Sequence, residues 1–299
     1  MREAPPLTQL TASQTDQFWR DGYLIVEQAL SPIELENLRS DFSVWVDASL
    51  SYQDDYGETL DGRARFDLDP LHSGTQSGLR RVQSPEEISE AFRHVMRNAR
   101  TVDICAELIG PAIRFHHGKV NSKRPGMATE VKFHQDFTFQ PMSNDDVITC
   151  LIFMDAVTEE NGPLQVVPGS HKGPLFSLWH DGVFTGAVAE EVVAQRQDQI
   201  VTCTGAAGSA CLMHSSLLHG SAGNFSGKSR TLYLATYYSD DAIELSPNAL
   251  PSRLTHELVR GEPSGRVRCT SYEMELPEVP QGTSFFAQQT VQSDTACHA

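Results

Sequence analysis

A histidine and an aspartate lie two residues apart in the segment Phe133-His134-Gln135-Asp136-Phe137. On a β-strand, residues two apart point to the same face, so His134 and Asp136 can aim at one point. One imidazole and one carboxylate are two of the three ligands in the facial triad of non-haem Fe(II) oxygenases. The pair predicts a metal site if a third ligand exists. Taken alone it is a weak signal, and a hydrogen-bonded pair at the surface is the alternative.

The third ligand must come from a more distant part of the chain. His219 follows an apolar run that ends at Leu218 and precedes the turn-like segment 221–224, which places it at the mouth of a β core. His214 lies five residues earlier and is the main rival, and a structural core histidine is the alternative for His219. The candidates considered downstream are His171, His180, His214, His219 and His256.

An arginine follows His219 at a spacing of eleven residues. Arg230 opens the apolar run 231–237, which predicts a strand next to the strand that carries the metal ligand. Because the planar guanidinium binds a carboxylate through two hydrogen bonds, Arg230 suits an anionic co-substrate that chelates the metal. The alternative is an ordinary salt bridge at the surface.

With these residues in place, the chain resembles the phytanoyl-CoA dioxygenase family of Fe(II)/2-oxoglutarate oxygenases. The match runs from about Asn121 to about Tyr238, and the opening segment 18–26 is also similar to the start of that family. Each piece alone is weak, but their order and the spacing from His219 to Arg230 agree with the family. The matching pieces are His134-Gln-Asp136, Glu160-Asn-Gly-Pro-Leu164, Val167-Pro-Gly-Ser-His171-Lys172, His219-Gly-Ser and Arg230.

The resemblance implies Fe(II) held by His134, Asp136 and His219, with 2-oxoglutarate and O2 as co-substrates. It implies that Arg230 binds the far carboxylate of 2-oxoglutarate, and it favours His219 over His214. The expected reaction is hydroxylation of an unactivated C–H bond of a small molecule, with release of succinate and CO2. Two further positions are expected at the co-substrate: Thr149 as a hydroxyl partner, and Asn121, which with Lys123 lies where relatives have polar lining residues.

The substrate side is less clearly marked. Thr138 shares the expected face of His134 and Asp136 and is a candidate for substrate contact, whereas Phe137 and Phe139 alternate with that face and are expected in the core. Arg80 and Arg81 could meet an anionic substrate, although a solvated pair is the commoner interpretation. A CoA thioester would need a dense cluster of Lys and Arg, which the chain does not have, so a free small molecule is favoured as the substrate. We expect a role in natural-product metabolism.

The order of the elements is helices first and strands afterwards. Ser13 is expected to cap a first helix that Gly22 ends, and Ser31-Pro32-Ile33-Glu34 is a capping box that starts a second helix. Residues 1–110 are therefore expected to be mostly helical, with 49–84 as an aperiodic, lid-like excursion. Short apolar runs over 111–240 predict the strands of a barrel, and 241–299 remains unassigned.

This order predicts an α+β, mainly β fold in a single domain over 1–299. The resemblance makes the core a double-stranded β-helix, a cupin-like jelly roll with the N-terminal helices packed on it. Two other classes share such a core: a cupin-like metal enzyme that does not use 2-oxoglutarate, and a non-catalytic barrel that binds a ligand.

The charge balance excludes some classes of binding partner. The chain of 299 residues carries 39 acidic and 23 basic residues, a formal net charge of −16. Because nucleic acids and anionic membranes attract basic surfaces, neither is expected as a partner. No apolar run is long enough to span a membrane, residues 1–10 do not form a secretory signal, and six scattered cysteines suggest reduced thiols and a cytoplasmic location. The oligomeric state stays open.

Overall fold

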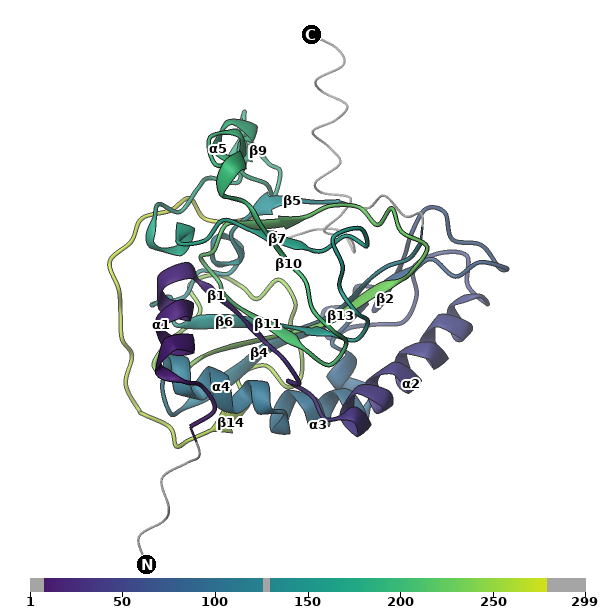
Figure 1. Cartoon of the computed structure of the whole chain (residues 1–299), viewed down its shortest axis with the longest axis horizontal. Helices are drawn as coiled ribbons and strands as arrows, with labels where there is room; N and C mark the ends of the chain where they lie inside the picture. Colours follow the sequence, from purple (N-terminus) through teal and green to yellow (C-terminus); the bar gives the residue numbers. More distant parts are fainter. Residues whose placement is uncertain (1–7, 126–129, 279–299) are drawn as a thin grey trace, which may run out of the picture.

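Two antiparallel sheets form the body of the protein in the computed structural model, which describes residues 8–125 and 130–278 (Figure 1). The large sheet has the strand order β1-β11-β6-β13-β4-β3-β2, with β14 paired to β4. Its strands are β1 (Tyr23–Val26), β2 (Phe66–Leu68), β3 (Leu79–Gln83), β4 (Ile113–Lys123), β6 (Val147–Phe153), β11 (Ala210–His214), β13 (Arg230–Ser239) and β14 (Leu258–Arg260).

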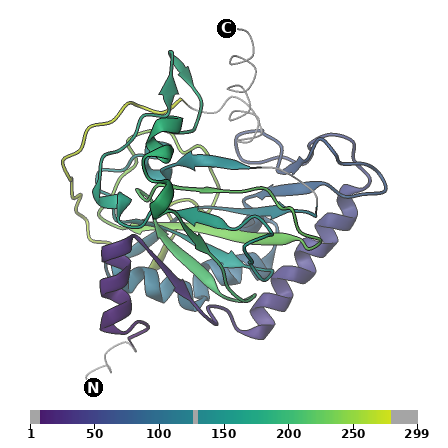
Figure 2. The same cartoon turned by 45° about the horizontal axis from the view of Figure 1, so that its top comes forward.

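The small sheet has the order β10-β7-β12-β5 and faces the large one (Figure 2). Its strands are β5 (Val131–His134), β7 (Leu164–Val166), β10 (Val201–Cys203) and β12 (His219–Ser221), and a separate hairpin joins β8 (Trp179–His180) to β9 (Val183–Phe184). Leu151 and Leu232 of the large sheet pack against Leu164 and Val166 of the small sheet. The predicted α+β, mainly β jelly roll is confirmed.

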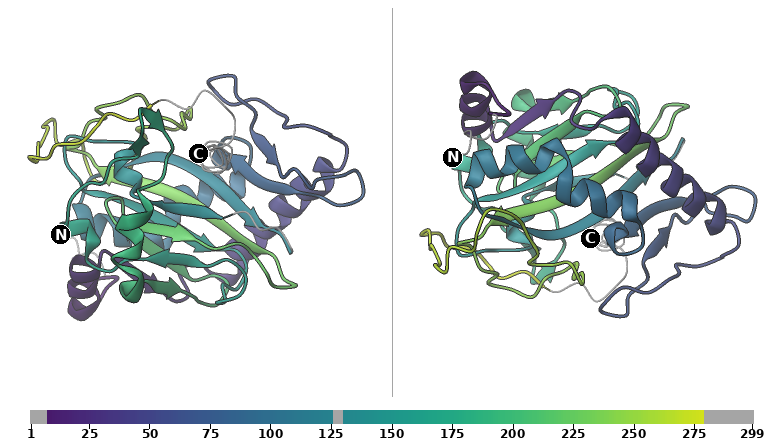
Figure 3. Two further views of the ribbon diagram at one scale, coloured as in Figure 1. Left: turned by 90° about the horizontal axis from the view of Figure 1, so that it is seen from above. Right: turned by 90° about the horizontal axis from the view of Figure 1, so that it is seen from below.

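Helices cover the outer face of the large sheet (Figure 3). They are α1 (Ala12–Asp21), α2 (Pro32–Ser49), α3 (Glu90–Asn98) and α4 (Arg100–Ile109), while the short α5 (Glu190–Ala194) lies near the small sheet. The largest apolar core lies between these helices and the large sheet, where Phe92 of α3 packs edge-on against Tyr233 of β13. The helices thus fix the large sheet from outside and leave its inner face to the space between the sheets.

Local signals in the sequence explain the helix ends. The capping box at Ser31 and Glu34 is present, with Pro32 at the first helical position, as predicted. At α1 the capping residue is Thr11 with Gln14, and not Ser13. Gly22 ends α1 with a φ of 81°, a left-handed conformation that favours glycine.

The segment 49–84 differs from the aperiodic excursion expected. It contains β2 and β3, which extend the large sheet beyond β4. The sequence hides β3 because its residues do not alternate between apolar and polar: the strand reads Leu-Arg-Arg-Val-Gln, and Arg81 within it is buried. In a sequence, a buried arginine looks like an exposed polar residue. The alternation of apolar and polar residues therefore does not reveal this strand.

The part of the chain after β13 crosses the outer surface of the sandwich. β14 adds to β4, and Arg97 of α3 forms an ion pair with Glu257 just before β14, at 2.5 Å. Further along, Arg268 pairs with Asp241 at 3.0 Å, and Tyr272 packs against Phe137. None of the helices in the described part of the chain is long and apolar enough to cross a membrane.

Candidate metal centre

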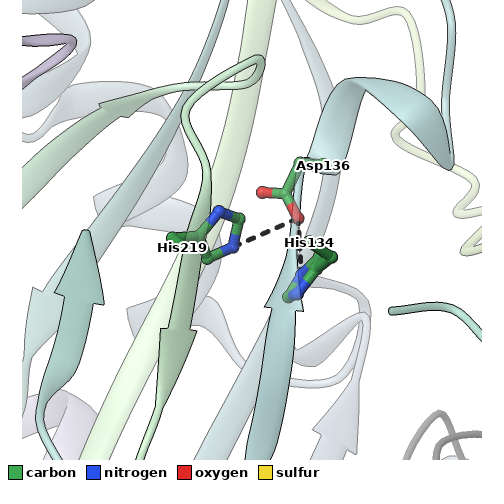
Figure 4. A group of neighbouring side chains, drawn as sticks. All are labelled: His134, Asp136 and His219. Carbon is green, nitrogen blue, oxygen red and sulfur yellow. Dashed lines mark ion pairs between the residues drawn. The ribbon is translucent and has the colours of Figure 1, made fainter. Parts of the chain in front are cut away.

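His134, Asp136 and His219 meet at one end of the small sheet (Figure 4). His134 is the last residue of β5, and it lies directly opposite His219, the first residue of β12, in the antiparallel pairing. Asp136 Oδ1 is 3.4 Å from His134 Nε2 and 3.6 Å from His219 Nε2. Within the described residues, these three side chains are the one group of three or more metal-binding types whose ligand atoms all lie within 4.8 Å.

The local geometry differs from that expected for His134 and Asp136. The strand β5 ends at His134, and Asp136 begins a short 3₁₀ turn (Asp136–Thr138). The turn, and not the alternation of a continuous strand, brings the carboxylate back toward the two imidazoles. The predicted closeness of His134 and Asp136 is therefore right, but its cause is the turn after β5 and not the alternation of side chains along a strand.

Backbone carbonyls orient both imidazoles. His134 Nδ1 is 2.8 Å from the carbonyl oxygen of Lys132, and His219 Nδ1 is 2.9 Å from that of Leu217. Since a carbonyl only accepts, each Nδ1 must carry the proton and each Nε2 must present its lone pair. Both lone pairs lie on the side of Asp136, which is the arrangement that a metal ligand set requires.

The carboxylate is held as firmly as the imidazoles. Thr149 on β6 donates a hydrogen bond of 3.2 Å to Asp136 Oδ2, which leaves Oδ1 facing the two histidines. Burial by itself raises the pKa of Asp136, but the neighbouring His219, His134 and Lys119 outweigh it and hold that pKa well below its usual range. Burial, together with the charge of His134, lowers the pKa of His219 to about 4. At neutral pH the site therefore offers one carboxylate and a neutral His219, the ionisation states that metal binding needs.

The rival histidines lie elsewhere. His214 ends β11 in the large sheet, where its Nδ1 accepts a hydrogen bond from the Ser216 amide and its ring lies 5.1 Å from that of His171. His171 Nε2 binds the carbonyl of Trp19 at the end of α1. Both side chains are buried parts of the packing between α1 and the sheets.

A cavity between the two sheets opens from the three residues. On its opposite wall, the alternate residues of β4 all face inward: His117, Lys119, Asn121 and Lys123. Leu151, Leu164 and Leu232 form an apolar part of the lining. The cavity thus has the metal-type ligands on one wall and basic side chains on the other.

Arg230 begins β13 and lines this cavity. Its strand belongs to the large sheet, so Arg230 faces the metal-type ligands across the cavity. The prediction of a strand next to the ligand strand is wrong, because β13 pairs with β4 and β6. Its Nε donates to the carbonyl of Gly162 at 2.9 Å, and Nη2 donates to the same oxygen. Burial lowers the pKa of Arg230 to about 10, so the guanidinium stays charged at neutral pH.

Lys123 lies near Arg230 and points along the same wall. Its Nζ donates to the Ser221 hydroxyl at 2.7 Å. Burial, and then the charge of Arg230, lower the pKa of Lys123 to about 6. At neutral pH Arg230 therefore carries the positive charge at this end of the cavity, and a bound anion would favour protonation of Lys123 beside it.

The other expected site residues have mixed positions. Asn121 lines the cavity, and its buried Oδ1 has no hydrogen-bond donor among the described residues. The hydroxyl of Thr149 is turned to Asp136 and to Thr236, at 3.1 Å, and Thr149 lies at a smaller adjoining cavity. Phe137 is buried in an apolar cluster and Phe139 packs against another, as expected, but Phe139 also lines the main cavity. Thr138 donates to the carbonyl of Gln135 and lines a separate pocket, so the expected alternation of these side chains is not followed, because the 3₁₀ turn breaks it.

Two basic residues of the cavity were missed or undervalued. The sequence motifs assign no role to Lys119, although Lys119, Asn121 and Lys123 follow one another at two-residue spacing, which is a usable signal on one strand. Arg81, whose commoner interpretation was a solvated side chain, is 5% exposed and lines the cavity. No sequence signal marked it as buried.

Comparison with known proteins now adds to this geometry. The family model for phytanoyl-CoA dioxygenase (PhyH) matches residues 18–232. A probable alpha-ketoglutarate-dependent hypophosphite dioxygenase from Stutzerimonas stutzeri is 31% identical over 240 residues, which are 78% of this chain and 80% of that protein. The chain belongs to the phytanoyl-CoA dioxygenase family.

More distant relatives agree with this assignment. An L-proline trans-4-hydroxylase from Streptomyces griseoviridis is 26% identical over 74% of this chain and 84% of its own length. The crystal structure of EctD from S. alaskensis with 2-oxoglutarate and 5-hydroxyectoine has a TM-score of 0.65 at 24% identity, and the alignment covers 89% of this chain and 90% of that one. The structural likeness shows the shared fold.

Proposed function

We propose that His134, Asp136 and His219 are the Fe(II) ligands of this enzyme and that Arg230 binds the far carboxylate of 2-oxoglutarate. As a member of its family, the protein is a 2-oxoglutarate-dependent dioxygenase that uses Fe(II), 2-oxoglutarate and O2. The observation that carries the ligand assignment is the convergence of two Nε2 lone pairs and one carboxylate oxygen, each fixed by a second hydrogen bond. Two nitrogens and one oxygen on one side suit Fe(II) with open coordination positions.

Iron, when bound, supplies the redox chemistry that couples decarboxylation of 2-oxoglutarate to oxidation of the substrate. The protein's residues position and shield the reactants. The carbonyls of Lys132 and Leu217 keep the imidazoles in the binding tautomer, and Thr149 keeps one carboxylate oxygen directed at them. Arg230 supplies the positive charge for an anionic co-substrate, which would in turn favour protonation of Lys123. The leucines of the lining keep bulk water away from the co-substrate.

Asn121 and Thr149 divide into two roles in this proposal. Asn121 lies between Lys119 and Lys123 on the cavity wall, where its Oδ1, which has no donor among the described residues, can accept a hydrogen bond from a ligand. Thr149 positions Asp136 through its hydrogen bond. Contact between Thr149 and 2-oxoglutarate stays a prediction.

The proposed reaction is hydroxylation of an unactivated C–H bond of a small molecule, with release of succinate and CO2. Its support is the set of relatives, whose names give L-proline, ectoine and hypophosphite as small molecules on which they act. A role in natural-product metabolism is part of the proposal. So is a cytoplasmic location, which rests on free thiols at the cysteines of the described residues; Cys297 lies outside those residues.

An anaerobic titration tests the metal and co-substrate assignment. Fe(II) is added to the metal-free protein, followed by 2-oxoglutarate, and the visible absorption band of the iron-chelated 2-oxo acid is recorded. We expect a saturable band in the native protein, its loss in Asp136→Ala, and a weaker affinity for 2-oxoglutarate in Arg230→Ala. Replacement of the exposed Asp198 by Ala is the control and should leave the band unchanged. A native protein that binds iron but never shows the band would refute the assignment.

A further inference from the structure

The main cavity has an unusual balance of charge for so acidic a chain. Its lining residues include six basic side chains: Arg63, Arg80, Arg81, Lys119, Lys123 and Arg230. Among the described residues that line it, Asp136 is the one carboxylate. The question is which of these cations already have a partner within the protein.

Two of the arginines are neutralised by aspartates. Arg63 forms an ion pair with Asp61, and its other contact is the carbonyl of Ala249. Arg80 binds Asp67 at 2.6 Å and lies 3.9 Å from Asp69. These side chains have structural partners and need no ligand.

Arg81 and Lys119 are different. In the part of the chain that the structure describes, neither has a carboxylate within ion-pair distance, and the buried Nε of Arg81 has no hydrogen-bond partner. Asp67 is the cross-strand neighbour of Arg81, but its carboxylate is bound to Arg80. Asp67 acts on Arg81, and Asp136 on Lys119, from beyond ion-pair distance. Both cations face the cavity from neighbouring strands.

The strand register places these two cations close together. Arg81 of β3 is opposite Asn121 of β4, and Gln83 is opposite Lys119, so Arg81 and Lys119 form a diagonal pair on one face. Diagonal neighbours of this kind are within reach of long side chains, and two like charges repel each other there. Asn121 lies between them in the register, and its Oδ1, which has no partner among the described residues, offers a hydrogen-bond acceptor beside the two cations.

Burial makes this repulsion costly to the protein. It lowers the pKa of Arg81 to about 10 and that of Lys119 to about 8, and the charge of Arg81 adds to the effect on Lys119. An oxyanion between the two would satisfy the guanidinium, stabilise the ammonium and remove the repulsion. The arrangement is understandable as a binding site and is unfavourable without a ligand.

This pair is separate from the one assigned to 2-oxoglutarate. Lys119 and Lys123 lie four residues apart on the extended β4, which corresponds to roughly 13 Å at about 3.3 Å per residue. Arg230 affects the pKa of Lys123, whereas Arg81 affects that of Lys119, so the cations form two groups along the wall. A co-substrate bound at Arg230 leaves the second group for another molecule.

We propose that Arg81 and Lys119 bind an oxyanion group of the primary substrate, so that the enzyme oxidises a small organic molecule with a phosphonate, phosphate or carboxylate at its non-reacting end. This inference rests on the proposed function, because it assigns the Arg230 end of the cavity to 2-oxoglutarate. Two positive charges favour a dianionic phosphonate or phosphate over a single carboxylate.

Calorimetric titration with simple anions tests the site without knowledge of the substrate. Methylphosphonate is titrated into protein that holds Fe(II) and saturating 2-oxoglutarate under anaerobic conditions, and acetate and the neutral dimethyl sulfone are titrated in parallel. We expect methylphosphonate to bind more tightly than acetate, and the sulfone not to bind. Arg81→Gln and Lys119→Met should each weaken anion binding by about tenfold or more, since each removes a charge-assisted hydrogen bond.

Matched variants show whether the loss is specific. Arg63→Gln removes another cavity arginine whose charge Asp61 already compensates, so it should change anion affinity less than about threefold. Arg81→Lys keeps the charge and should recover part of the affinity, which also covers the case in which Arg81→Gln does not fold. Unchanged anion binding in Lys119→Met and the Arg81 variants would overturn the proposal, as would a native protein that binds neither anion.

A second readout separates this inference from the proposed function. The visible band of iron-chelated 2-oxoglutarate should persist in Lys119→Met and Arg81→Gln, and excess methylphosphonate should not remove it. Loss of the band in these variants would assign the pair to the co-substrate and overturn the proposal. If the native protein shows no band, the proposed function fails, and titration of the metal-free protein with methylphosphonate still decides whether Arg81 and Lys119 bind an oxyanion.

Discussion

Each of the three candidate iron ligands is oriented by one hydrogen bond, which directs its ligand atom at the site. The two imidazoles are fixed by carbonyls two residues earlier in the chain, and Asp136 is fixed by a hydroxyl from the other sheet. The carbonyls belong to the same strands and loops as the histidines, so those bonds persist whenever the small sheet is formed. The bond from Thr149 crosses between the sheets and is the one that a single substitution can remove.

Thr149→Val should therefore weaken iron binding while the protein stays folded. Loss of a hydrogen bond to a metal ligand typically reduces metal affinity by about 10- to 100-fold. The measurement is a competitive Fe(II) titration against a chelator, with the melting temperature recorded for each variant. Thr101→Val is the matched control, because Thr101 is a buried threonine of α4 whose hydroxyl has no hydrogen-bond partner among the described residues. Equal iron affinities in the two variants would contradict a positioning role for Thr149.

At this scale the sequence predicts the reactive residues better than the binding residues. His134, Asp136 and His219 are rare residue types at a recognisable spacing, and the structure brings them together. Arg81 and Lys119 are common types, and their importance comes from the absence of a nearby carboxylate within the described residues. Whether a charge has a partner is a property of tertiary structure, which residue spacing does not report.

The strands and turns that carry the site were predictable to different degrees. The apolar runs that became β6, β11 and β13 read as strands because both of their faces are buried. β5 and β12 are short, β5 ends at His134 and β12 begins at His219, so the turn that directs Asp136 has no periodic signal. β2 and β3 have no periodic signal because charged residues are buried within them: Asp67 in the three-residue β2, and Arg81 in β3.

Gly22 joins the first helix to the large sheet and should be intolerant of substitution. A Cβ atom at this position would lie 2.4 Å from His171 Nδ1 and 2.8 Å from Leu217 Cδ1, on a backbone with a φ of 81°. Gly22→Ala should therefore lower the free energy of unfolding by more than the roughly 1–2 kcal/mol of left-handed backbone strain. Gly182→Ala is the control. Gly182 has a φ of 77°, and a Cβ atom there would have no neighbour within 4 Å, so this variant has the backbone strain alone. Urea denaturation of both variants measures the difference, and equal losses would show that the contact with His171 is relieved at no cost.

Across the whole molecule, net charge and local charge have opposite signs. The net charge of −16 argues against polyanionic partners, but it does not describe the cavity, whose wall is basic. Acidic residues such as Asp61 and Asp67 neutralise part of the basic wall from behind it. The composition therefore predicts the outer surface and gives no information about the small ligand inside.

Stability of the molecule should depend on pH through Glu86, a buried carboxyl group remote from the candidate ligands. Neither of its oxygens has a hydrogen-bond partner among the described residues, and burial raises its pKa from 4.5 to about 8. The folded state thus binds a proton more tightly than the unfolded state. Its contribution to the free energy of unfolding is fully present below about pH 4.5 and is lost as the pH rises through about 8.

Glu86→Gln should remove this dependence, because the amide resembles the protonated acid. The difference in unfolding free energy between the variant and the native protein should shift in favour of the variant from pH 5 to pH 9, measured by urea denaturation at each pH. Glu36→Gln, at an exposed position of α2, is the control and should show no such shift. A difference that is the same at both pH values would mean that Glu86 is not proton-linked to folding.

The two walls of the cavity have separate origins in the chain. The candidate iron ligands come from β5, β12 and the turn after β5, whereas Arg81 comes from β3, which extends the large sheet beyond β4. Mutations in β3 can therefore alter what the cavity holds without moving the residues that carry out oxidation. In evolutionary terms, this division lets substrate preference diverge through substitutions in β3. Purifying selection can meanwhile preserve the candidate iron ligands on the small sheet.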